Sequence, residues 1–187
     1  MDQNRMAVVI AIVVIGVIAV AAIAFVTSRK RRSQKLKERF GPEYDRVMRQ
    51  EGDSRKAEGV LEFRQKRREK FNIRPLSAAN RSSFAEGWSE VQARFVDDPQ
   101  GAVTLADSLV TDVMQARGYP IGAFEQRAAD LSVDYPVIVD NYRAAHDIAL
   151  RHSSGKASTE DLRQAMVHYR VLFQELLDEP KTHRRGA

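Results

Sequence analysis

The chain has 187 residues, enough for one folded domain with a single core. It contains no cysteine, which excludes disulfides, thiol nucleophiles and thiolate metal ligands. The formal net charge of +5 is unevenly distributed, because residues 28–70 hold 16 basic and 8 acidic side chains, whereas residues 71–180 hold 10 and 16. The basic character therefore belongs to residues 28–70, and a nucleic-acid interface on the acidic remainder is disfavoured.

The most apolar stretch of the chain runs from Met6 to Val26 and contains no charged residue. As a helix it would extend about 30 Å, the thickness of a bilayer hydrocarbon core. One basic residue, Arg5, precedes this run, whereas Arg29-Lys30-Arg31-Arg32 follow it almost at once. By the positive-inside rule, this asymmetry predicts a single-pass plasma-membrane protein whose C-terminal domain is cytoplasmic.

A cleaved signal peptide is the alternative interpretation, since Ala22-Ile23-Ala24 resembles a cleavage site. A signal peptide, however, carries its charges before a shorter apolar run. If the C-terminal domain is instead extracytoplasmic, the chain would be an exported, membrane-tethered helical domain that binds a small ligand or an envelope component. The sequence leaves this alternative open.

Residues 29–71 are predicted to form a basic helical stem beside the membrane. Each basic residue near an anionic leaflet contributes about 1 kcal/mol to binding, so the first basic cluster is expected to contact anionic lipid head groups. The predicted contact residues are Arg29, Lys30, Arg31, Arg32, Lys35, Lys37 and Arg39.

Two short helices are predicted to complete this stem. Pro42 suits the first turn of one helix, and Asp53 or Ser54 is placed to cap the next, which ends near Phe71. The basic run from Arg64 to Lys70 has no continuous apolar face. We therefore expect this run to be solvated rather than to lie on the membrane.

Residues 72–180 are predicted to form an acidic bundle of four or five helices, because apolar residues recur at helical spacing and no stretch demands a strand. Ser77, Asp98 and Ser158 are expected to cap helices, and Tyr135-Pro136 to open one. Trp88 is interpreted as a core residue rather than part of a peptide groove.

The predicted fold class is thus all-α, in four parts. Residues 1–28 form the N-terminal tail and transmembrane anchor, 29–71 the stem, 72–180 the bundle and 181–187 a flexible basic tail.

Three segments resemble a family of uncharacterised bacterial proteins. They run from Arg39 to Arg46, from Ala93 to Pro99 and from Met114 to Pro120, and His168-Tyr169-Arg170 is similar as well. The resemblance covers the chain from about residue 36 to residue 177. It implies a membrane segment followed by a helical region, and it assigns no activity. Proteins of this kind are sometimes labelled secreted, whereas the flanking charges here favour the cytoplasm.

No motif indicates catalysis or cofactor binding. The sequence lacks a nucleophile elbow, a phosphate-binding loop and a dinucleotide fingerprint. Its four histidines, His146, His152, His168 and His183, lack the spacing of a metal site. We therefore predict no catalytic residue, cofactor or metal, and a protein that is not an enzyme.

The predicted function is a membrane-anchored helical interaction or scaffold module that faces the cytoplasm. Its predicted partners are the lipid bilayer with its anionic head groups and a protein that the sequence does not identify. No nucleic acid is expected, and no residue of the head is assigned to partner binding.

Overall fold

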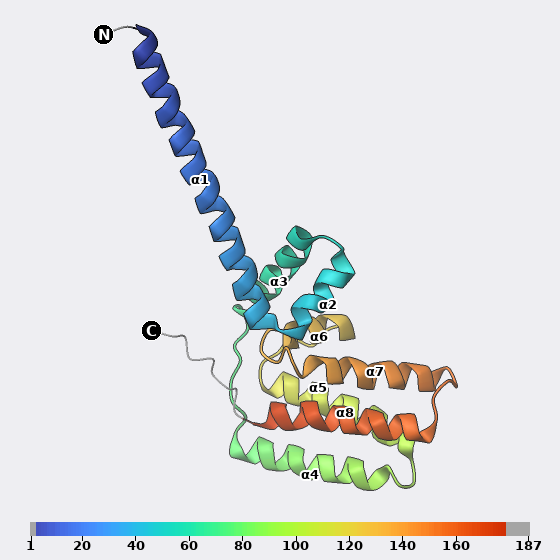
Figure 1. Cartoon of the computed structure of the whole chain (residues 1–187). Helices are drawn as coiled ribbons and strands as arrows, with labels where there is room; N and C mark the ends of the chain where they lie inside the picture. The colour runs from blue at the N-terminus through green and yellow to red at the C-terminus, as the bar shows by residue number, and fades with distance from the viewer. Residues whose placement is uncertain (1–2, 179–187) are drawn as a thin grey trace.

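The computed structural model describes the backbone of residues 3–178 and the side chains of residues 12 and 14–178. These residues form eight helices and no strand, which confirms the all-α prediction (Figure 1). The predicted basic tail, residues 181–187, lies outside the described residues. In chain order the helices are α1 (Gln3–Phe40), α2 (Pro42–Glu51), α3 (Ser54–Arg68), α4 (Ala78–Arg94), α5 (Pro99–Ala116), α6 (Phe124–Leu131), α7 (Val139–Ser153) and α8 (Thr159–Leu177).

Helix α1 projects from the rest of the molecule as one uninterrupted helix (Figure 1). We call its residues 12–27 the arm; all of the arm side chains that the structure describes are exposed. Over the part of the chain described, no helix is both long enough and apolar enough to cross a membrane, so the predicted transmembrane helix is not confirmed. Residues 6–11 and 13 of the predicted anchor lie outside the described side chains.

The end of α1 packs with α2 and α3, and we call residues 29–40, α2 and α3 together the stem. Pro42 stands at the start of α2, and Asp53 caps α3 by accepting a hydrogen bond from the backbone N–H of Lys56, as predicted. The buried residues of the stem form their own apolar cluster, to which the segment after α6 adds Val133. The cluster consists of Leu36, Phe40, Tyr44, Val47, Ala57, Leu61 and Val133.

Helices α4 to α8 form the second core, and we call them with their connections the head. Helix α8 packs against α7 and α5, and α4 packs against α5. Trp88 on α4 is buried and stacks on Phe173 of α8, with 4.7 Å between ring centroids. This contact confirms that Trp88 is a core residue, and the head is a helical bundle of the predicted kind.

Side-chain caps begin three head helices where the sequence predicted them. Ser77 and Asp98 accept hydrogen bonds from backbone N–H groups of α4 and α5, and Ser158 forms a complete capping box with Asp161. The predicted start of α7 at Tyr135 was wrong. Residues 135–138 form a separate turn, in which the Ile138 N–H donates to the Tyr135 carbonyl, so the helix begins only at Val139.

Candidate functional site

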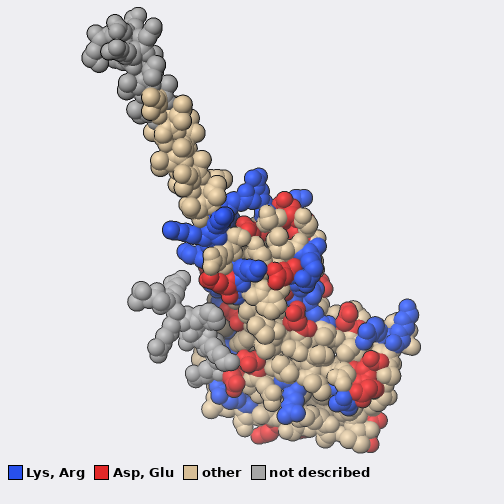
Figure 2. Space-filling model, viewed as in Figure 1, with Lys and Arg blue, Asp and Glu red and all other residues tan. Residues whose placement is uncertain are grey.

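The seven basic residues predicted to contact lipid all lie on α1, directly after the arm, and all are exposed. Lys and Arg side chains gather where the arm meets the body of the molecule (Figure 2). Arg32 forms a two-bond ion pair with Glu62 of α3. Within the described part of the chain, the other six form no ion pair. The cluster is therefore available to an anionic partner.

A groove of about 720 Å³ runs between α1 and α3 at this level. We call it the α1–α3 groove. Its walls combine four basic side chains with two acidic and three uncharged ones. They are Ser28, Arg31, Arg32, Lys35, Leu36, Glu38 and Arg39 of α1 with Glu62 and Gln65 of α3.

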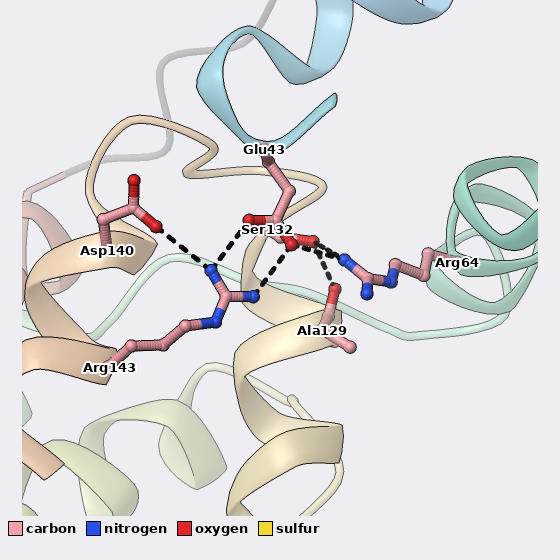
Figure 3. Close-up of polar contacts among 6 residues, drawn as sticks. All are labelled: Glu43, Arg64, Ala129, Ser132, Asp140 and Arg143. Carbon is pink, nitrogen blue, oxygen red and sulfur yellow. Dashed lines mark hydrogen bonds and ion pairs between the residues drawn. The ribbon is translucent and has the colours of Figure 1, made fainter. Parts of the chain in front are cut away.

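The carboxylate of Glu43, in the first turn of α2, joins the stem to the head (Figure 3). Its side chain is fully buried. The Oε1 atom accepts a hydrogen bond from Arg64 of α3 at 2.6 Å, and the two carboxylate oxygens accept from Arg143 of α7 at 2.7 and 2.8 Å. Arg64 also donates to Ser132, and Arg143 to Asp140. One acid therefore connects three helices.

Two further arginines of α3 bind acids of the head. The Arg67 Nε donates to Asp130 at 2.9 Å, and the side chain of Asp130 is fully buried. Arg68 pairs with Asp134, which also accepts a hydrogen bond from the phenol of Tyr119 at 2.5 Å. Burial and the Asp134 charge raise the pKa of Tyr119, so this phenol stays protonated and donates.

These contacts correct the prediction that the run from Arg64 to Lys70 is solvated. Three of its arginines lie against the head because α3 places Arg64, Arg67 and Arg68 on neighbouring turns of one face. The acids at positions 130 and 134 are also one turn apart, at the end of α6 and just beyond it. This matching spacing was the available signal, but the sequence alone does not say that the two segments meet.

A second cleft, of about 570 Å³, separates α2 from α6 and α7. Both walls carry charges of both signs. The α2 wall has Asp45, Arg46 and Arg49, and the opposite wall has Glu125, Asp140, Arg143 and Asp147. We call it the α2–α7 cleft. Charged groups on both walls favour ligands or side chains that carry charge themselves.

His146 of α7 borders the α2–α7 cleft, where its ring stacks on Phe124 with 3.6 Å between centroids. Burial lowers the pKa of His146, which favours the neutral imidazole. Among the other histidines, His168 contacts the side-chain oxygen of Asn141 at 2.8 Å, and His183 lies outside the described residues. Within the described part, no group of three histidine or carboxylate side chains could hold a metal ion.

Comparison of the chain with models of known protein families, with curated proteins and with solved structures finds no match. The function is therefore inferred from the residues themselves.

Replacing Glu43 by glutamine tests the connection between stem and head. The variant leaves Arg64 without a counter-charge and Arg143 with Asp140 alone, and both side chains are mostly buried. Losing one partner of a buried ion pair costs about 3–5 kcal/mol. We expect a loss of that size in the free energy of unfolding of the full chain, measured in detergent by urea titration with circular dichroism. The control is Glu51→Gln, because Glu51 lies exposed at the other end of α2. It should change the free energy by less than about 0.5 kcal/mol. Equal effects of the two substitutions would contradict the role of Glu43.

Proposed function

We propose that the chain is a single-pass plasma-membrane protein whose head is a docking or scaffold module at the cytoplasmic face, not an enzyme. The observation that carries the proposal is the continuity of α1, which runs without a break from the exposed arm into the packed stem. Ile15 and Phe25 of the arm are 66% and 67% exposed. A run of exposed apolar side chains of this kind is stabilised when lipid covers it.

The basic cluster after the arm supports the proposed direction across the membrane. Basic residues near the end of an inserted helix favour the cytoplasmic side. Anionic lipids of that leaflet would also attract the same side chains. The arm and the cluster therefore make two consecutive contacts with one membrane, the first apolar and the second electrostatic.

The ion pairs between stem and head support a scaffold role. Glu43 of α2 binds Arg143 of α7, and Arg67 and Arg68 of α3 bind Asp130 and Asp134. Val133 of the head also packs in the stem core. A head attached in this way keeps a defined orientation relative to α1. Such an orientation matters for a protein that presents a binding surface at a fixed distance from the membrane.

The partner of the head is proposed to be a protein with a basic surface. Residues 71–180 carry six more acidic than basic side chains, and complementary charge speeds association and selects partners. The head helices also leave acidic side chains exposed outside the contact with the stem, among them Glu86 and Glu90 on α4.

The second candidate is an exported, membrane-tethered domain that binds a small ligand or an envelope component. The α2–α7 cleft favours it, because the cleft is large enough for a small molecule and has charged groups on both walls. The two candidates place the head on opposite sides of the membrane.

Reporter fusions after Leu177 distinguish these two orientations. In a bacterial host, we expect a green fluorescent protein fusion to be fluorescent and an alkaline phosphatase fusion to be inactive, since the phosphatase matures only outside the cytoplasm. The matched control shifts the excess of positive charge from the C-terminal to the N-terminal flank of the apolar run. In it, Arg29, Lys30, Arg31 and Arg32 are changed to glutamine and lysines are added before Met6. This control should reverse both signals. Phosphatase activity in the unmodified fusion would overturn the cytoplasmic orientation.

Photo-crosslinking in cells tests the scaffold role of the full chain. A photoreactive residue at Glu86 or Glu90 should give the same protein adduct from both positions, because both face solvent on α4. The same residue at Val17 in the arm should not give that adduct. If neither head position gives a reproducible protein adduct, the proposal of a docking module fails.

A further inference from the structure

The α1–α3 groove contains a row of basic side chains on one face of α1. Arg31, Lys35 and Arg39 are four residues apart, so they lie one above another along the helix. Like charges at this spacing repel and destabilise a helix by a few tenths of a kcal/mol per pair. None of the three forms an ion pair with any residue that the structure describes. The row therefore favours an anion from outside the chain.

The acids of the groove do not supply that anion. Glu62 is already paired with Arg32, and Glu38 accepts a hydrogen bond from Gln34 on its own helix. The groove thus keeps an excess of positive charge over a volume of about 720 Å³, enough for a phosphate with its substituents.

The groove begins where the arm ends. Ser28 lines it, and Val26, two residues earlier, belongs to the exposed apolar surface of the arm. If the arm is inserted in a membrane, the groove opens at the depth of the lipid head groups. A ligand that is anionic at one end and apolar at the other would fit both surfaces.

We infer that the α1–α3 groove binds the phosphate of one anionic phospholipid, whose acyl chains lie along the arm. This inference rests on the proposed membrane anchoring and adds a defined site to it. Arginine and lysine side chains donate charge-assisted hydrogen bonds to phosphate oxygens, and the arginines can do so with two nitrogens at once. The apolar arm favours a lipid over a soluble phosphate.

Binding is tested on the full chain in uncharged detergent micelles, where no charged membrane surface attracts the other basic residues. Native mass spectrometry would measure the affinity for phosphatidylglycerol and for phosphatidylcholine with the same acyl chains. We expect one phosphatidylglycerol per chain, bound at least about tenfold more tightly than phosphatidylcholine. In the triple variant Arg31→Gln, Lys35→Gln, Arg39→Gln, the affinity for phosphatidylglycerol should fall at least about tenfold.

The control is the triple variant Arg29→Gln, Lys30→Gln, Lys37→Gln, which removes the same charge from α1 outside the groove. Its affinity for phosphatidylglycerol should stay within about threefold of the unmodified chain, because in uncharged micelles only residues of the groove contact the phosphate. Equal losses in the two triple variants would overturn the groove as the site. If the groove triple variant lowers stability, the single variant Lys35→Gln, in the middle of the row, replaces it. This variant should weaken the binding of phosphatidylglycerol, and unchanged binding would count against the site.

Two further measurements distinguish the remaining explanations. Glycerol 3-phosphate has the phosphate but no acyl chain, so it should not displace the lipid at equal concentration; displacement would assign the groove to a soluble phosphate. Alkaline carbonate should leave the unmodified chain in the membrane fraction. Release would contradict the proposed anchoring, whereas retention together with equal losses in the two triple variants would contradict only the groove site.

Discussion

The orientation of the head depends on one buried carboxylate. Glu43 lies at the start of α2, immediately after the turn that ends α1, and binds arginines from α3 and α7 at once. A buried charge is costly unless it is paired and hydrogen-bonded. Glu43 is therefore stable only while the arginines stay bound to it, and the stem can leave the head only by separating Glu43 from Arg143.

The uneven charge distribution of the chain also helps to attach the stem to the head. The basic stem and the acidic head meet along α3, where Arg67 and Arg68 bind Asp130 and Asp134. Arg67 and Arg68 of the stem are thus bound to acids of the head, whereas the basic cluster on α1 stays exposed beside the arm. Helix α3 therefore attaches the stem to the head, and the basic cluster of α1 is left to contact a partner outside the chain. The ion pairs of α3 also hold the packed stem, and with it α1, against the head.

Local features of the fold were predictable from the sequence, because local interactions produce them. The caps at Asp53, Ser77 and Ser158 depend on residues three positions apart, and Trp88 belongs to a short helical stripe of apolar residues. The attachment of the stem was not predictable in this way. Its partners are 63 to 100 positions apart, and one sequence by itself gives no sign of which basic run meets which acid. The α1–α3 groove likewise requires two helices in their final positions. The predicted transmembrane anchor was not confirmed among the described residues and remains part of the proposal.

A distance measurement across the junction tests the central claim most directly. The natural chain has no cysteine, so Lys37→Cys on α1 and Glu90→Cys on α4 would give two spin labels at exposed positions. If Glu43 holds the stem to the head, pulsed electron paramagnetic resonance on the full chain in lipid nanodiscs should give one narrow distance distribution. Adding Glu43→Gln should broaden it. A broad distribution in the chain that retains Glu43 would contradict the account, because the head would then move independently of α1.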